Sequence, residues 1–170
     1  MRKRIGLLAS LTVVIVVAFA VAALADMANG TGKTHKGNTL GFNAKSNLTG
    51  SFEYNGAPGT RFAIYNVHCN DYLTYTPGTY TDKNLNPGTY PSVTLTTNTC
   101  SDAVTGETYF VHAVVVDEGE PGTYDFACIQ IYDGQTLTLL VKDRGYIQNG
   151  NIQIHTNTDG TTEADILSTV

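Results

Sequence analysis

The residues best suited to chemistry lie in one acidic segment, residues 117–125, which we call the acidic loop. It carries four carboxylates within nine residues, between two apolar runs. Calcium takes several oxygen ligands, often from a flexible loop, so Asp117, Glu120 and Asp125 are the candidate ligands of a calcium site. Their spacing does not match an EF-hand loop. Acidic residues are also common in solvated turns, so an ordinary hairpin connection is the alternative.

Three cysteines, Cys69, Cys100 and Cys128, follow the N-terminal segment. An odd number leaves one of them without an intramolecular disulfide. Cys69 and Cys100 each come at the end of a strand-like run, so we expect them to form the disulfide, with the other two pairings as alternatives. A loop of this length contributes about 3–4 kcal/mol in the chain-entropy description. Cys128 is expected to be a small, buried or half-buried side chain.

No pattern of a catalytic or zinc site is present. The four histidines, His35, His68, His112 and His155, show no i, i+4 spacing and no Cys-x-x-Cys pair accompanies them. The Gly-x-Ser-x-Gly pattern of a nucleophilic serine is absent as well. Carboxylates gathered in one loop also differ from the facing pair that glycoside hydrolysis needs. We therefore expect a protein that is not an enzyme and has no cofactor besides the calcium considered above.

Aromatic residues suggest a second kind of site. The chain has 10 tyrosines and no tryptophan, and most of the tyrosines fit a strand pattern. Tyr72, Tyr75 and Tyr80 lie instead in a polar, threonine-rich stretch. Exposed aromatic rings with a polar tip can stack on sugar rings, so these three are the candidate ligand-binding residues.

The N-terminal end is typical of an export signal. Arg2, Lys3 and Arg4 precede an uncharged apolar run at 5–24, which ends in Ala-Leu-Ala. Residues 1–25 therefore read as a signal peptide cleaved after Ala25. An uncleaved membrane anchor and a pilin-type leader are the alternatives, because the run is long enough to span a bilayer. We expect a secreted or cell-surface protein that contacts the membrane only if the segment is retained.

The rest of the chain divides into three parts by composition. Residues 26–38 are rich in Gly, Thr, Asn and Lys and read as a flexible linker. Residues 39–155 form the expected domain, and 156–170 a polar C-terminal tail. Three of the 10 basic residues and none of the 15 acidic ones lie in the first 25 positions, so the processed chain is acidic. An acidic surface repels phosphate backbones, which argues against nucleic acid as a partner.

Alternating apolar and polar residues dominate the domain. Residues 137–142 and 152–154 alternate, and 109–116 is apolar on both faces, which indicates a central strand. The turn Pro-Gly-Thr occurs four times, at Pro58, Pro77, Pro87 and Pro121, and the last three continue with Tyr. About nine short strands result, and no window keeps a helical period. The sequence predicts an all-β fold, an antiparallel β-sandwich or barrel-like sandwich.

Several segments resemble a bacterial exported β-rich domain of uncharacterised function, which occurs as a C-terminal module of surface proteins and as small secreted proteins. The segments are LGFNAK at 40–45, GSFEYN at 50–55, VVVDEGEPGTYD at 114–125, IQIYDG at 129–134 and GNIQIH at 150–155. The chain departs from that pattern between Tyr72 and Thr99, where an Asn/Pro/Gly-rich insertion stands. The resemblance implies an all-β, exported, non-catalytic module and brings no activity with it.

These observations favour a non-enzymatic, secreted or cell-surface module with a structural or adhesive role. One alternative is a calcium-stabilised domain that binds carbohydrate or another ligand. The other is a fibre or pilus subunit, in which a strand from 26–48 or 163–170 completes the sheet of a neighbour. The partners expected are extracellular polysaccharides or other surface proteins.

Overall fold

The computed structural model describes residues 25–156, which form ten β-strands. Within these residues no helix has the length and apolarity needed to cross a membrane. The strands are β1 (Ala25–Lys33), β2 (Thr39–Lys45), β3 (Gly50–Asn55), β4 (Asn66–Asn70), β5 (Thr74–Asp82), β6 (Gly88–Asp102), β7 (Thr108–Val116), β8 (Phe126–Asp133), β9 (Leu139–Tyr146) and β10 (Gln148–Thr156).

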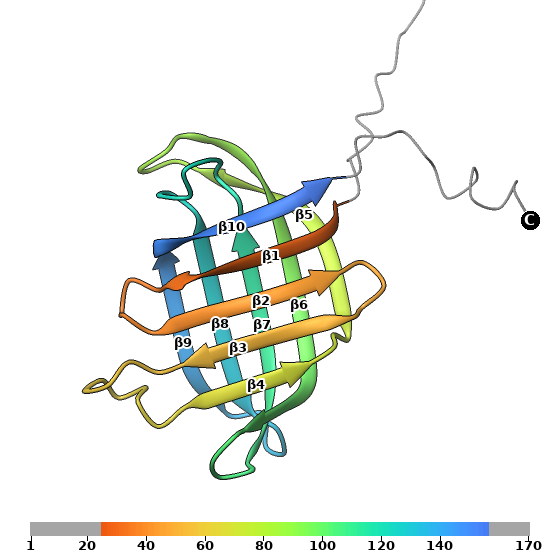
Figure 1. Ribbon diagram of the computed structural model, residues 1–170, viewed down its shortest axis with the longest axis vertical. Coiled ribbons are helices and arrows are strands. Elements are labelled where there is room, and N and C mark those ends of the chain that lie inside the picture. The colour runs from red at the N-terminus through yellow and green to blue at the C-terminus, as the bar shows by residue number, and fades with distance from the viewer. Residues whose placement is uncertain (1–24, 157–170) are drawn as a thin grey trace, which may run out of the picture.

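One antiparallel sheet folds over on itself into a nearly closed, barrel-like structure. The strand order is β10-β1-β2-β3-β4-β6-β7-β8-β9, and β5 pairs with β6 beside this path. In Figure 1 the strands β10 and β1 to β4 cross in front of β6 to β9, which run in a different direction behind them. The expected all-β antiparallel fold is confirmed, in its barrel-like form.

The core lies between the two layers because alternate residues of each strand point inward. On β7, Val111, Ala113 and Val115 are almost fully buried, while Phe110, His112 and Val114 on the other face are half-buried. This is the central strand that the two-sided apolar pattern predicts, and it pairs with β6 and β8. The largest fully buried side chains facing inward are Tyr54, Phe52, Leu40, Leu95, Ile129, Ile131 and Ile152.

The predicted flexible linker at 26–38 is wrong. Residues 25–33 form β1, which lies between β10 and β2 and pairs with both along its length. The small residues of this strand, Gly30 and Gly32, give no apolar alternation from which it could be predicted. They do allow the β1 backbone to lie close to side chains of its neighbours. A Cβ atom on Gly32 would lie 2.3 Å from the Ile147 side chain. The domain therefore includes residues 25–38, and the described residues form ten strands instead of the expected nine or so.

The other predicted boundaries fall at or beyond the ends of the described part. Strand β10 ends at Thr156, close to the predicted domain end at 155. The predicted signal peptide, except for Ala25, and the tail from 157 onward lie outside the described residues. Ala25 and Thr156 pair with each other, so the two ends of the described part lie side by side.

Strand β6 joins the two layers, and a disulfide fixes it there. It pairs with β7 on one side, and on the other with β5 near its start and β4 near its end. Cys69 of β4 lies directly opposite Cys100 of β6, and the two form a buried disulfide. The predicted pairing is confirmed. Cys128 is a half-buried free thiol on β8, as expected.

Candidate functional site

The acidic loop braces the outer edge of β10. Asp125 accepts hydrogen bonds from the backbone amides of Glu118 and Ile152, at 2.9 and 2.5 Å. Asp117 accepts one from the amide of Ile154, at 2.9 Å. Strand β10 pairs with β1 on its other side, so these carboxylates satisfy amides that an edge strand would leave open.

The three candidate calcium ligands are therefore used in other ways. Within residues 25–156, no three His, Cys, Asp or Glu side chains are grouped so that they could hold a metal ion. Asp117 and Asp125 bond to backbone amides, and Glu120 bonds to two side-chain amides of β10. The geometry gives a calcium site no support, and calcium binding stays a prediction.

The three candidate tyrosines do not form one exposed patch. Tyr72 is only 6% exposed, and its hydroxyl donates to the Ser51 carbonyl at 2.6 Å, so its predicted exposure is wrong. Tyr75 is half-buried and packs against the core. Tyr80 lies on the opposite face of β5, where its ring stacks on Phe126 with centroids 5.4 Å apart. The threonines around these tyrosines suggested an exposed, irregular stretch. They are strand residues instead, because threonines of β5 hydrogen-bond to threonines of the neighbouring strand β6.

A cleft of 930 Å³ lies where β9 turns into β10, and we call it the corner cleft. Four segments line it: the β1–β2 hairpin with His35, the β5–β6 turn with Leu85, the acidic loop with Tyr124, and residues 145–150 at the corner. In Figure 1 the β5–β6 and β7–β8 loops lie together near the start of β10. Its size falls within the range of about 300–1,000 Å³ that small-molecule sites occupy.

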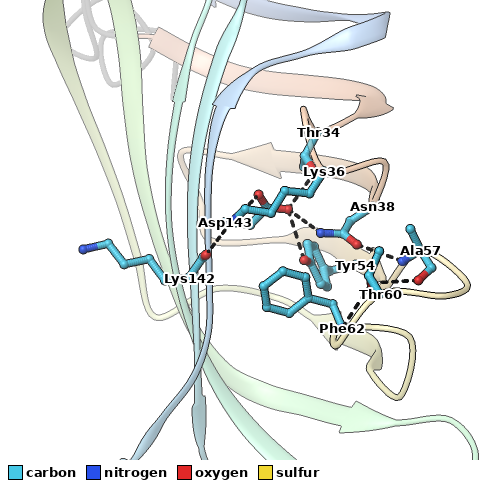
Figure 2. A network of polar contacts seen from close by, with 9 residues as sticks. All are labelled: Thr34, Lys36, Asn38, Tyr54, Ala57, Thr60, Phe62, Lys142 and Asp143. Atoms are coloured by element: carbon cyan, nitrogen blue, oxygen red, sulfur yellow. Dashed lines mark hydrogen bonds and ion pairs between the residues drawn. The ribbon is translucent and has the colours of Figure 1, made fainter.

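A buried carboxylate fixes the hairpin wall of the corner cleft. Asp143 of β9 points inward and is fully buried. One of its oxygens accepts hydrogen bonds from the Thr34 hydroxyl and the Asn38 amide, both at 2.6 Å, and from the Tyr54 hydroxyl at 3.1 Å (Figure 2). Thr34 and Asn38 belong to the β1–β2 hairpin, so this network ties β9 to a hairpin of the other layer.

Lys36 completes the same network. Its ammonium lies 3.4 Å from the other oxygen of Asp143 and also donates to the Lys142 carbonyl at 2.9 Å. The two contacts place a positive charge beside a carboxylate that has no solvent contact of its own. His35 lies between the bonded residues Thr34 and Lys36, and so the network sets the position from which His35 faces the cleft.

A second buried carboxylate, Asp82, holds the β5–β6 turn and the ring of Tyr146. It accepts hydrogen bonds from the backbone N–H groups of Asn84 and Asn86, and from the Tyr146 hydroxyl at 2.8 Å. Burial alone would raise the pKa of Asp82, but these hydrogen bonds outweigh it and hold the pKa below its usual range. Leu85, within the same turn, is 63% exposed at the cleft.

The third wall is the acidic loop itself, which Glu120 fastens to β10. One oxygen of Glu120 accepts hydrogen bonds from the side-chain amides of Asn151 and Gln153, at 2.9 and 3.0 Å. Gly122 has φ 76°, and a Cβ there would lie 2.2 Å from the Asn151 side chain, so only glycine fits. The result is a fixed loop that presents Tyr124, which is 43% exposed.

Glu118 belongs to the same loop, and its carboxyl group is buried without a hydrogen-bond partner. It is 6% exposed, and neither carboxyl oxygen has a hydrogen-bond partner. Burial, with the nearby charge of Asp82 adding to it, raises the pKa of Glu118 to about 7. An uncompensated carboxyl in such a place opposes folding when it is ionised.

The lining of the corner cleft differs in charge from the residues that support its walls. No Lys, Arg, Asp or Glu side chain lines it, although carboxylates hold three of its segments from behind. The lining includes two tyrosines, Tyr124 and Tyr146, together with Gln148, Asn149 and His35. Such a lining offers aromatic contact and neutral hydrogen-bonding groups.

A second, shallower hollow of 350 Å³ lies on the outer face of β7 and β8. Phe110 and Tyr132 pack there with ring centroids 5.9 Å apart, and the His112 ring hydrogen-bonds the Gln130 amide oxygen at 3.1 Å. Leu137, 63% exposed, completes its lining. This hollow is shallower and smaller than the corner cleft. Its residues therefore provide control substitutions for tests of that cleft.

Sequence reasoning missed the corner cleft because its residues come from four distant segments. One signal was available for Tyr124, which follows a Pro-Gly-Thr turn within the acidic loop. Nothing local marks His35, Leu85 or Tyr146, whose neighbours along the chain do not differ from those of ordinary turn and strand residues.

The comparisons with known proteins leave the family open. No protein-family model, no curated protein and no solved structure matches the chain. The resemblance to a bacterial exported domain therefore stays a prediction.

Proposed function

We propose that this chain is a non-enzymatic extracellular module with an adhesive role, which contacts its partner through the corner cleft. The observation that carries the proposal is the separation of carboxylates from the cleft surface. Asp82, Glu118 and Asp125 are all buried, and none of them lines the cleft. A bound molecule would meet preformed walls and no carboxylate placed for acid or base catalysis.

The disulfide supports the proposal that the protein is exported. Disulfides persist in oxidising compartments such as the cell exterior. The Cys69–Cys100 bond is buried between β4 and β6, and the N-terminal segment has the features of an export signal. A crosslinked, single-sheet domain of this kind suits a protein that must persist outside the cell.

The two alternatives receive unequal support. The carbohydrate-binding half of the calcium-stabilised alternative is favoured by the aromatic and amide lining of the corner cleft. Strand exchange from 26–48 is disfavoured, because β1 and β2 already pair on both sides within the same chain. The other donor segment considered, 163–170, lies outside the described residues.

Binding of the labelled, secreted protein to intact cells and extracellular material of its source tests the proposal. We expect saturable binding that Tyr124→Ala abolishes and Tyr132→Ala, the matched change on the outer face of β8, leaves intact. Unchanged binding by the Tyr124 variant would remove the cleft from the proposal. A turnover activity lost on changing His35 or Tyr146 would refute the non-enzymatic role.

A further inference from the structure

We propose that the corner cleft binds a neutral polysaccharide chain. The inference rests on the proposed function and adds the chemical class of its ligand. The first argument is charge. The chain carries 15 acidic and 10 basic residues, and yet no charged side chain of the described part lines the cleft. A polyanion would find no cation there and would be repelled by the surrounding acids, whereas a cation would find no carboxylate.

The second argument is the fixed aromatic surface. Tyr146 is held by its hydroxyl, 2.8 Å from Asp82, and by an edge-on contact with the Phe126 ring, with centroids 5.6 Å apart. Tyr124 is 43% exposed on a loop that Glu120 fastens in place. Sugar rings carry C–H groups on their faces, which pack on such aromatic rings, and ring positions fixed in advance lower the entropic cost of binding.

The third argument is the supply of neutral hydrogen-bonding groups. Gln148 and Asn149 are exposed at the corner, and each amide offers both a donor and an acceptor. His35 faces the same space from the opposite hairpin. Hydroxyl groups around a sugar ring also donate and accept, so the two sets of groups match. A lipid tail would leave these polar groups without partners.

An extended peptide fits the site less well. Peptides that dock on β-structure usually add a strand to a free edge of the sheet. The edges of β9 and β10 both reach the cleft. On β10 the amides of Ile152 and Ile154 already bond to Asp125 and Asp117, and on β9 the Lys142 carbonyl accepts a hydrogen bond from Lys36. These bonds leave less room for an added strand and favour a ligand recognised through side chains, as a glycan is.

Affinity electrophoresis of the full secreted protein tests the inference. The gels contain a galactomannan, a mixed-linkage β-glucan or dextran as neutral probes, and polygalacturonate as an acidic one. We expect retardation by at least one neutral probe and none by the acidic one. Tyr124→Ala should weaken that binding by about tenfold or more, as removal of a central aromatic contact does. Tyr132→Ala should bind like the wild type, and circular dichroism should show that both variants are folded at the temperature of the gel.

Three results would overturn the inference. These are no retardation by any neutral probe, stronger retardation by polygalacturonate, or loss of binding in the Tyr132 variant alone. If no probe is retarded while Tyr124→Ala still abolishes binding to cells, the adhesive role stands and the glycan ligand fails. If binding to cells also survives the Tyr124 change, the proposed function fails as well.

Discussion

At the scale of single residues, carboxylates act as internal braces. Asp143 gathers three hydrogen bonds from two hairpin residues and a strand of the other layer. Asp125 bonds backbone amides of its own loop and of β10. Ionised acceptors make stronger hydrogen bonds than neutral ones, which suits them to joining segments that the sheet does not pair. Glu118 is the exception, since its buried carboxyl has no such bond.

Replacing Glu118 by glutamine should stabilise the protein at high pH only. The pKa of Glu118 is about 7 in the folded protein, against 4.5 for the ordinary group, so the folded state holds the proton more tightly. Stability is full below pH 4.5 and is lost as the pH rises through 7. We expect Glu118→Gln to raise the free energy of unfolding by about 2 kcal/mol at pH 8. At pH 4 it should have little effect.

Urea denaturation at the two pH values measures this difference. Glu53→Gln is the matched control, because Glu53 is exposed on β3 and its change should stay within about 0.5 kcal/mol. An equal effect of Glu118→Gln at pH 4 and pH 8 would show that the gain does not come from the proton.

At the scale of elements, the acidic loop, the Asp143 network and the disulfide each stabilise the fold at a place where strand pairing is incomplete. Strand β10 has one free edge, and the acidic loop covers it. Strands β9 and β10 stand at the two ends of the strand order, and the Asp143 network ties β9 to the β1–β2 hairpin. Strand β4 is short and pairs with only three residues of β6, and there the disulfide lies.

Removing the disulfide should therefore weaken the fold measurably. The two cysteines are 31 residues apart, and a loop of that size corresponds to about 3–4 kcal/mol of unfolded-state entropy. We expect the double change Cys69→Ala and Cys100→Ala to lower the free energy of unfolding by about 3 kcal/mol. Urea denaturation measures it. Cys128→Ala is the control, with a loss below about 1 kcal/mol, and equal losses in both variants would contradict the assignment.

At the scale of the whole molecule, one end of the barrel-like sheet carries the corner cleft, which is the proposed site. Three loops and the β9–β10 corner meet there, and each is braced from behind by a carboxylate or by the sheet. The core between the layers is filled by side chains, so the proposed ligand space lies on the outside, at the corner. Binding at rigid loop ends of a packed β-domain is a common arrangement.

Calcium should leave the stability of the whole domain unchanged. The three candidate ligands, Asp117, Glu120 and Asp125, already accept hydrogen bonds from amide donors, so a metal ion would have to displace those donors. We expect melting temperatures of the secreted protein in millimolar calcium and in chelator to agree within about 1 °C. Binding at a hundredfold excess over Kd would add about 2.7 kcal/mol and raise the melting temperature by several degrees. A rise of that size that Glu120→Gln abolishes would establish a calcium site.

The sequence by itself determined the features that depend on near neighbours. The alternation of apolar and polar residues predicted the all-β fold, and the apolar residues on both faces of 109–116 predicted its central place. Both predictions were possible because successive residues of a strand point to opposite faces of the sheet. Strand-end positions predicted the Cys69–Cys100 bond. The same local reading failed for β1, whose glycines and polar residues resemble a linker, since pairing with β10 and β2 comes from distant parts of the chain.

Only the tertiary structure decided what the polar residues do. Thr34 and Asp143 are 109 residues apart in the chain and 2.6 Å apart at their hydrogen bond. The acidic loop has the composition of a calcium site, yet its ligand-like oxygens meet the amides of β10 first. The closing of the sheet brings such partners together, and their positions along the chain do not predict it. The corner cleft exists for the same reason, because four segments become neighbours only when the two layers have packed.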